Sequence, residues 1–362
     1  MFKLKSRFRA TELQKAIISV VIGLLLGAFL MLLYGYHPIE AYKALFKGAF
    51  SDLYSFAESL ANATPLILTA LTFAIGLRGG MFNIGAEGQV YIGALTAVFV
   101  TTLHLPAGLD FALSLILAAV FGALWALIPA ILKITRGVHE VISTIMFNWI
   151  AKYLAFFMIT KVLVDPTRAE KTISIAKSSR FPLLVPGTSA SYGIFVAVFA
   201  AFLIYVLLWR TVLGFHIRVA GYNPKAAQYA GIARQKVVLW AFLIGGITAG
   251  LAGAVHVMGR PPTYAIYTGM PALTGLGFSG LAVSMIGRNH PIGIIIASIF
   301  YGGLLAGGRM MQISSRVPFE LVNMLMGLIV IFLAIPPEKF LAVGKKAVED
   351  ILPRKTFKGG EK

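Results

Sequence analysis

The stretch FALSLILAAVFGALWALIPAIL, residues 111–132, contains no Asp, Glu, Lys or Arg and decides the fold class. A helix needs about 20 mainly apolar residues to cross the roughly 30 Å hydrocarbon core of a bilayer. Similar uncharged runs occupy residues 16–36 and 191–208. The strands of a membrane barrel would be shorter and would alternate apolar with polar residues, so these runs predict membrane-spanning helices.

The composition agrees with an integral membrane protein. The 362 residues are 58% hydrophobic and 13% charged, whereas soluble domains contain about 25% charged residues. The net charge of +18 would suggest nucleic-acid binding in a soluble protein. Here the basic residues follow the membrane segments, so we expect no nucleic-acid partner. The chain has no cysteine, which excludes disulfides and thiolate metal sites.

The hydropathy pattern predicts an all-α membrane protein, a polytopic bundle of about ten transmembrane helices. About twice as many Lys and Arg residues fall on the side of the two termini as on the other side, which predicts cytoplasmic N and C termini. We expect a basic N-terminal segment 1–15, a transmembrane domain 16–336 and a basic tail 337–362. The predicted spans are 16–35, 59–77, 83–104, 111–132, 139–162, 191–209, 237–258, 268–287, 291–307 and 318–336.

Two hydrophilic segments between these spans are long. The extracytoplasmic loop 163–190 carries four basic residues, which a long loop tolerates better than a short one. The cytoplasmic loop 210–236 contains NPKAAQYAGI, residues 223–232. An Asn cap, a Pro at the first helical position and a stop at Gly231 predict a short exposed helix there. Composition alone is equally compatible with a simple surface connector.

Glycines and other small residues recur at helical spacing. Gly23 with Gly27, and Gly246 with Gly250, predict faces where helices pack closely. Gly-rich stretches at 76–93 and 269–293 occupy comparable places in the two halves of the chain, as structural duplications in transporters do.

Motifs for catalysis and for ATP binding give little support to other functions. No G-x-x-x-x-G-K-[ST] motif occurs, so any ATP must be bound by another chain. GLGFSG could suggest an intramembrane serine protease with Ser279 and His290. These residues are eleven positions apart, about 16 Å along a helix, whereas a nucleophile and its base must lie about 3 Å apart. A kinked loop, or His256 as the base, would keep this alternative open.

A stand-alone ion-coupled carrier is a second alternative of a different class. It would need carboxylates within the membrane to bind Na⁺ or H⁺. The available carboxylates lie near the ends of predicted spans, where water or an arginine can satisfy them; they are Glu58, Glu87, Glu140 and Glu320.

Four stretches carry a resemblance to a known family. They are GLRGGMFNIGAEGQVYIGA (76–94), HEVISTIMFNWIA (139–151), GFHIRVAGYNPKAAQYAGI (214–232) and GFSGLAVSMIGRNHPIGIIIASIFYGGLLAGG (277–308). They resemble the permease subunits of ATP-binding-cassette importers of the ribose, simple-sugar and branched-chain amino acid superfamily. The resemblance runs from about residue 55 to 335 and is strongest to the nucleoside-uptake branch, which works with a basic-membrane-protein type lipoprotein.

This resemblance implies a multi-pass subunit of the prokaryotic plasma (inner) membrane that forms a path for nucleosides by alternating access. A simple sugar such as ribose, or a branched-chain amino acid, is the alternative solute. The implied partners are a second permease, homologous or identical, a cytoplasmic ATPase and an extracytoplasmic solute-binding lipoprotein. The chain itself would have no catalytic residues, metal site or cofactor, because ATP and Mg²⁺ would be bound by the ATPase.

The resemblance also assigns the cytoplasmic loop to docking on the ATPase. Small or capping residues of this loop match the family's coupling segment, and its basic residues would pair with acidic groups of the ATPase. The small and capping residues are Gly221, Asn223, Ala226, Ala227 and Gly231, and the basic residues are Arg218, Lys225 and Arg234.

Two polar stretches are candidates for the translocation path. Near the first Gly-rich stretch a nucleoside could stack on Phe82 and hydrogen-bond with Asn83, Glu87 and Gln89. The second stretch contains His139, Glu140, Ser143 and Asn148, partly one helical turn apart.

A structural alternative for the first stretch stays equally open. Arg78 and Glu87 could form an ion pair that holds a helix elbow at the cytoplasmic surface, with Asn83 as a cap.

Overall fold

The computed structural model describes residues 12–334. The predicted tail 337–362 and most of the predicted segment 1–15 therefore lie outside the described residues. The described residues divide into two compact units, residues 12–39 with 318–334, and residues 40–317. In the first unit, α1 (Glu12–Leu33) packs on α13 (Phe319–Ala334). A Cβ on Gly23 would lie 2.9 Å from the Ile329 Cα, so Gly23 permits the close packing that was predicted.

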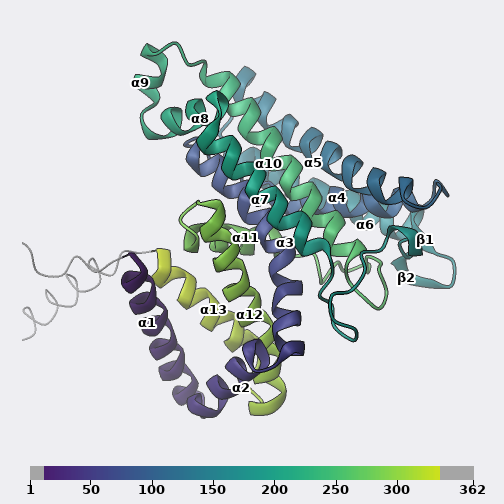
Figure 1. The fold of residues 1–362 in the computed structure, drawn as a ribbon, viewed down its shortest axis with the longest axis vertical. Coiled ribbons are helices and arrows are strands. Elements are labelled where there is room, and N and C mark those ends of the chain that lie inside the picture. Colours follow the sequence, from purple (N-terminus) through teal and green to yellow (C-terminus); the bar gives the residue numbers. More distant parts are fainter. Residues whose placement is uncertain (1–11, 335–362) are drawn as a thin grey trace, which may run out of the picture. The chain divides into compact units, whose positions relative to one another are not determined.

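The second unit is mostly helical, as predicted (Figure 1). Its long helix α10 (Arg234–Met258) packs against α3, α4 and α5. The α-helices of this unit are α2 (Pro38–Phe50), α3 (Leu53–Arg78), α4 (Ala86–Thr101), α5 (Leu109–Arg136), α6 (Glu140–Phe157), α7 (Gly193–Arg210), α8 (Val212–Tyr222), α9 (Pro224–Tyr229), α10, α11 (Leu276–Ile286) and α12 (Pro291–Ser315).

Glycines make the close contacts of α10. A Cβ on Gly250 would lie 2.2 Å from the Ala118 carbonyl oxygen of α5, and one on Gly93 of α4 would lie 2.0 Å from the Gly250 carbonyl oxygen. A Cβ on Gly246 would lie 2.5 Å from the Gly122 carbonyl oxygen. The predicted packing face at Gly246 and Gly250 is therefore confirmed, and any larger residue would push the backbones apart.

Within the described part of the chain, six helices are long and apolar enough to cross a membrane. They are α3, α5, α6 with its π-helical extension Met158–Val162, α7, α10 and α12. Each of the ten predicted spans contains a helix, but α11 has only 11 residues, which extend about 16 Å. The count of ten crossings and the cytoplasmic termini therefore stay predictions.

The predicted span 268–287 starts too early. Residues 259–275 form a loop before α11, because Gly275 has a left-handed φ of 86° and stands at the N-cap. Apolar composition alone did not distinguish this loop from a helix.

The 163–190 loop departs from the all-α prediction. It contains a hairpin of β1 (Val164–Asp165) and β2 (Arg168–Thr172), and a 3₁₀ turn at Lys177–Ser179. Lys171 forms a 2.8 Å ion pair with Asp165. Lys171 and Thr167 donate hydrogen bonds to the Asp165 carboxylate. These bonds stabilise its charged form and hold the pKa of Asp165 well below its ordinary value.

The hairpin also holds the 259–275 loop. The Thr172 N–H donates to the Ile266 carbonyl at 2.9 Å, and the Ile175 N–H donates to the Tyr264 carbonyl at 2.8 Å. Figure 1 shows α8 and α9 at one end of the second unit and the hairpin at the other.

Candidate functional site

The residues between α3 and α4, 79–85, form a buried bend that we call the elbow. Asn83 is 2% exposed, and its Oδ1 accepts a 3.0 Å hydrogen bond from the Gly85 N–H. Its Nδ2 would lie 3.4 Å from a Cβ on Gly245, which is in the middle of α10. The elbow thus lies buried beside the middle of α10. Gly85, not Asn83, is the N-cap of α4.

An amide from another helix satisfies the irregular backbone of the elbow. Asn148 of α6 accepts a 2.8 Å hydrogen bond from the Gly88 N–H and donates a 2.9 Å bond to the Ile84 carbonyl. At membrane depth such backbone groups are tolerated only where protein or a water-filled cavity satisfies them. Asn148 therefore has a clear structural role.

Glu87 connects the two Gly-rich stretches of the sequence. Its buried carboxylate accepts hydrogen bonds from the Tyr91 hydroxyl at 2.9 Å, the Gly275 N–H at 2.6 Å and the Gly277 N–H at 2.9 Å. The two N–H groups belong to the start of α11, where the helix dipole favours a negative charge. Glu87 thus joins α4 to α11.

Arg78 has different partners. Its guanidinium donates to the carbonyls of Asn289 at 3.1 Å and Arg288 at 3.2 Å, and it lies 5.3 Å from the centre of the Trp209 ring. The predicted ion pair of Arg78 with Glu87 is therefore wrong. The two residues lie nine positions apart across the bend, and each hydrogen-bonds with a different set of backbone groups.

Part of the predicted path surrounds a cavity of about 230 Å³. Glu87, Asn148, Tyr91, Trp149 and Lys152 line it. The Lys152 ammonium lies 5.0 Å from the centre of the Trp149 ring. Sequence reasoning missed Lys152 as a site residue, although a lysine within an apolar span is itself a signal.

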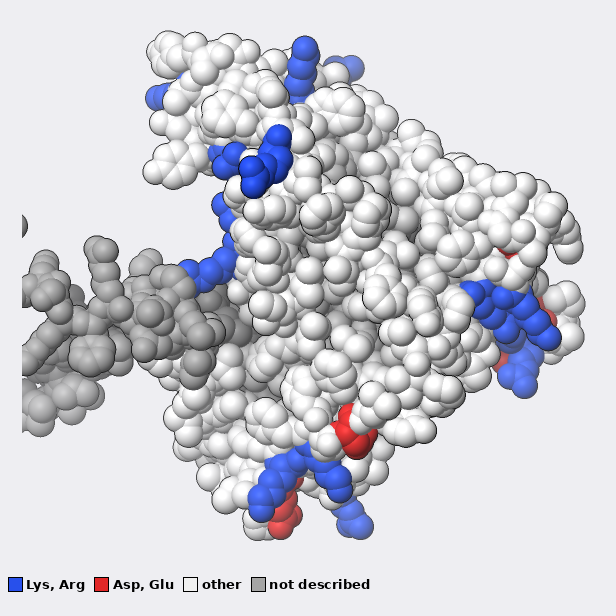
Figure 2. Space-filling view, viewed as in Figure 1, with Lys and Arg blue, Asp and Glu red and all other residues white. Residues whose placement is uncertain are grey.

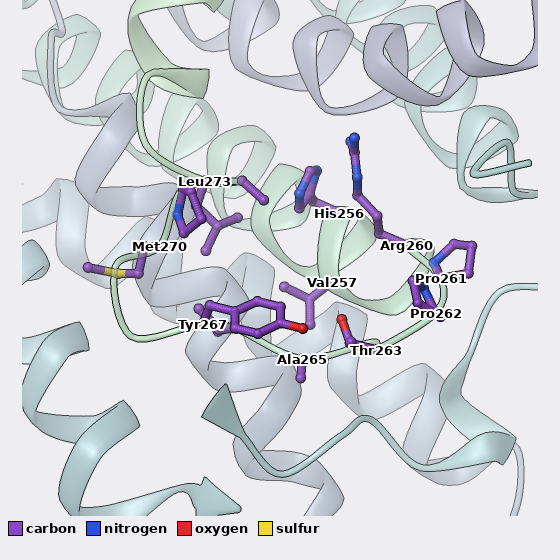
Figure 3. A pocket seen from close by; sticks show the side chains of 13 residues that line it. His256, Val257, Arg260, Pro261, Pro262, Thr263, Ala265, Tyr267, Met270 and Leu273 are labelled. Atoms are coloured by element: carbon purple, nitrogen blue, oxygen red, sulfur yellow. The ribbon is translucent and has the colours of Figure 1, made fainter. Parts of the chain in front are cut away.

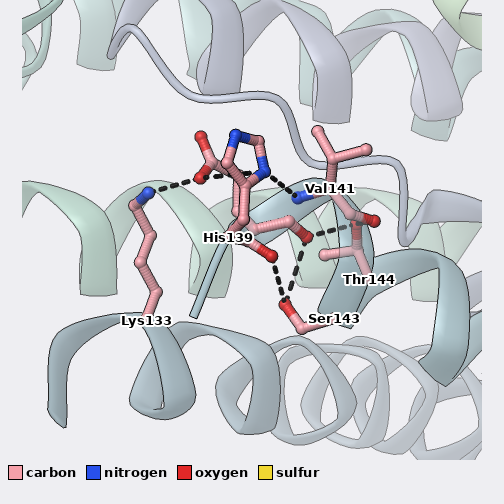
Figure 4. A network of polar contacts seen from close by, with 6 residues as sticks. Lys133, His139, Val141, Ser143 and Thr144 are labelled. Atoms are coloured by element: carbon pink, nitrogen blue, oxygen red, sulfur yellow. Dashed lines mark hydrogen bonds and ion pairs between the residues drawn. The ribbon is translucent and has the colours of Figure 1, made fainter. Parts of the chain in front are cut away.

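The remaining predicted path residues lie elsewhere. Phe82 is half-buried in the elbow, and Gln89 is buried, its Oε1 without a hydrogen-bond partner in the described part of the chain. His139 is the exposed N-cap of α6, and its Nδ1 accepts from the Val141 N–H at 3.3 Å. Glu140 forms an ion pair with Lys133 of α5, as Figure 4 shows. His139 and Glu140 thus fix the start of α6, while Asn148 of the same stretch reaches the cavity.

The loop 210–236 folds as predicted around its short helix. Asn223 caps α9 by accepting a 3.0 Å hydrogen bond from the Ala226 N–H, Pro224 begins the helix, and Gly231 beyond it has a φ of 75°. The preceding residues form a further helix, α8, that the sequence did not predict. We call residues 212–232 the coupling segment.

The exposure of the coupling segment differs from the prediction at one residue. Ala227 is only 3% exposed, so its small side chain serves packing within this chain and is unavailable to a partner. Tyr222 and Tyr229 are 95% and 94% exposed. The predicted docking residues do not include these two tyrosines, although the sequence places one aromatic residue at each end of the polar stretch.

Basic residues surround a groove beside the coupling segment. The groove has a volume of about 780 Å³, and Arg78, Arg218 and Arg288 line it together with Gly221 and Ala226. The Arg218 Nε is buried without a hydrogen-bond partner in the described residues. Lys225 and Arg234 are exposed nearby. In Figure 2, basic side chains gather at the α8–α9 end on the face shown, and no acidic side chain is visible there.

A third cavity, of about 250 Å³, lies where α10 ends and the 259–275 loop begins (Figure 3). His256 lines it from the last turn of α10, and Arg260, Thr263, Tyr267 and Met270 line it from the loop. It lies at the hairpin end of the unit, away from the coupling segment.

The protease alternative finds no support in this geometry. The His290 ring packs against Trp209, 4.7 Å between ring centres, and Ser279 hydrogen-bonds with Tyr301. The two residues therefore have separate partners.

Comparison with protein families decides the class of protein. Residues 55–334 match the model of the branched-chain amino acid transport system / permease component family. The chain belongs to this family. It is a permease and a multi-pass membrane protein, and its relatives are transporter subunits without an enzymatic activity of their own.

Curated relatives cover most of the chain. The guanosine ABC transporter permease protein NupP of Bacillus subtilis is 40% identical over 90% of this chain and 94% of its own length. The nucleoside ABC transporter permease protein NupB of Lactococcus lactis is 34% identical, over 95% and 94%. The glucose ABC transporter permease protein TsgB13 of Haloferax volcanii is 31% identical, over 88% and 86%.

The first two relatives each have a second permease protein in the same organism. NupQ of Bacillus subtilis is 32% identical over 67% of this chain and 78% of its own length, and NupC of Lactococcus lactis is 28% identical over 68% and 79%. Permeases of this kind thus occur as pairs.

Proposed function

We propose that this chain is one permease subunit of an ATP-driven nucleoside importer in the prokaryotic plasma membrane. The 40% identity to a guanosine permease over nine-tenths of the chain carries the proposal. A relative named for nucleosides from a second organism supports it. A glucose permease is less similar, at 31% identity, so a simple sugar is the second candidate solute.

The cavity around Glu87 and Asn148 supports a path along the exposed face of α6 and α11. Lys152 lies on this face within a candidate span, and Trp149 and Phe278 beside it are exposed in the isolated chain. A charged side chain facing lipid at this depth is costly, and such residues normally face protein or a water-filled cavity. We infer that the second permease covers this face and that the path runs between the two subunits.

The elbow and the path are compatible roles for the same stretch. Asn148 holds the backbone of the elbow, Glu87 follows the elbow in the first turn of α4, and both line the cavity. A rearrangement of the elbow would therefore change the wall of the path directly, which alternating access requires.

The coupling segment is the proposed docking surface for a cytoplasmic ATPase, which would bind ATP and Mg²⁺. Tyr222 and Tyr229 offer exposed aromatic anchors, the kind of residue that contributes most at interfaces. The groove beside them, which Arg78, Arg218 and Arg288 line, suits an acidic side chain of the partner. The opposite end, with the hairpin, would meet the solute-binding lipoprotein.

Uptake by the reconstituted complex tests the solute. The two permeases, the ATPase and the lipoprotein are placed in vesicles, and uptake of radiolabelled guanosine is competed with unlabelled adenosine, ribose and glucose. The proposal expects competition by adenosine and little by either sugar. Uptake of radiolabelled glucose or ribose by the same vesicles, with no guanosine uptake, would favour the sugar importer.

A further inference from the structure

The cavity at the end of α10 is enclosed by a loop that is held in place. The 259–275 loop covers it, and the hairpin and the residues after it fix that loop through the hydrogen bonds of Ile266 and Tyr264 described above. Figure 3 shows His256 near the end of α10, Arg260 just beyond that helix, and Tyr267 farther along the loop. These hydrogen bonds hold the loop that forms one wall of the cavity.

Two polar groups of this cavity lack adequate partners. His256 is 7% exposed, and its Nε2 has no hydrogen-bond partner among residues 12–334. A buried polar group without a partner is costly, so one that faces a cavity is a candidate for binding a ligand.

Arg260 is the second such group. Among residues 12–334, its guanidinium makes one hydrogen bond to another side chain, and that bond is long, 3.4 Å from Nη1 to the Asn62 Oδ1. Burial and the nearby charge of Arg309 lower the pKa of Arg260, while the charge of Glu58 raises it. Glu58 already accepts a 2.6 Å hydrogen bond from the Ser189 N–H. The guanidinium, which stays protonated in proteins, therefore retains donors for a solute.

Tyr267 supplies the third element. It lines the same cavity and is partly exposed. Bases stack on aromatic side chains irrespective of their identity, whereas an arginine fork distinguishes them. Guanine presents two neighbouring acceptors, O6 and N7, that match this fork, but adenine presents a donor beside its acceptor.

We propose that this cavity is an entry site that takes the base of a nucleoside arriving at the hairpin end and prefers guanine and hypoxanthine to adenine. Arg260 binds the carbonyl oxygen and ring nitrogen of the base, Tyr267 stacks on the base, and His256 hydrogen-bonds with the ribose. The inference rests on the proposed function and adds a site and a base preference to it.

The substitution Arg260→Lys tests this, because lysine keeps the charge and loses the planar fork. The complete complex in vesicles is supplied with saturating lipoprotein, and initial uptake of guanosine, inosine and adenosine is measured. We expect guanosine and inosine uptake to fall about tenfold relative to adenosine, the usual size of discrimination by a bidentate contact. Arg309→Lys is the matched control, because Arg309 lies close to Arg260 but does not line the cavity.

The outcomes are separable. Equal loss for all three nucleosides, or no loss, would overturn the base preference while the nucleoside importer stands. If the unaltered complex takes up glucose and none of the nucleosides, the proposed function fails. His256→Gln, which keeps a hydrogen-bonding group, should slow all three nucleosides alike while the receptor still stimulates ATP hydrolysis; unchanged uptake would remove His256 from the site.

Discussion

Gly221 of the coupling segment packs directly on the backbone of Gly80 in the elbow. A Cβ on Gly80 would lie 3.0 Å from the Gly221 Cα, and a Cβ on Gly221 would lie 2.1 Å from the Arg78 carbonyl oxygen. The contact is thus between bare backbones, and it joins the proposed ATPase docking surface to the bend that holds Glu87. Movement of the coupling segment would reach the elbow without an intervening flexible side chain.

Replacing Gly221 with Ala should break this contact. The new methyl group must displace either α8 or the elbow, so we expect uptake per ATP hydrolysed to fall about tenfold, within the usual range of coupling between sites. The measurement is the ratio of uptake to ATP hydrolysis by the reconstituted complex. Gly327→Ala is the control, because nothing lies within 4 Å of a Cβ at that helical glycine. An unchanged ratio in Gly221→Ala would show that the contact transmits nothing.

Asn148→Asp tests the support of the elbow. The carboxylate still accepts from the Gly88 N–H but cannot donate to the Ile84 carbonyl. Leaving a buried group unpaired costs about 1–3 kcal/mol, and the added negative charge increases the cost. Thermal unfolding of the purified complex in detergent should begin at a lower temperature. An unaltered unfolding temperature in Asn148→Asp would contradict these two hydrogen bonds.

Glu87→Gln tests the junction of α4 with α11. Glutamine keeps the shape but loses the charge that the start of α11 favours, so we expect a loss of about 1–2 kcal/mol, the difference between charged and neutral hydrogen bonds. Tyr91→Phe removes one of the three donors and should cost less. Unfolding measured side by side for both variants should give this order, and transport should fall further in Glu87→Gln. The reverse order would mean that the carboxylate is held mainly by Tyr91.

Tyr229→Ala separates docking from folding. Because Tyr229 is 94% exposed, its removal should change the stability of this chain by no more than about 0.5 kcal/mol. Co-purification of the ATPase should nevertheless weaken. Ala227, which the sequence places among the docking residues, is unsuitable for such a test because a larger side chain there would disturb the packing of α9. ATPase binding that is insensitive to both Tyr229→Ala and Tyr222→Ala would place the docking surface elsewhere.

The sequence predicted the elements whose determinants are local. The apolar runs gave the helices, and the cap, proline and glycine around α9 gave that helix to within a residue. The glycine spacing in α10 predicted close packing because helical periodicity places Gly246 and Gly250 on one face.

Features that depend on tertiary contacts could not be predicted from the sequence. Arg78 and Glu87 are close in sequence and opposite in charge, yet each is satisfied by the backbone of residues about two hundred positions away. Ala227 looked like an interface residue by its size, but its direction is set by the packing of α9. Arg260 carries no comparable signal in the sequence, because only the folded loop places it beside a cavity.

The central claim is that a separate ATPase drives solute movement through this chain and its partner permease. The most direct measurement is guanosine accumulation in vesicles that hold either the complete complex or the purified chain alone, with and without ATP. The account predicts uphill accumulation only for the complete complex with ATP. Accumulation against a gradient by the solitary chain, driven by an ion gradient in vesicles without any ATPase, would contradict it.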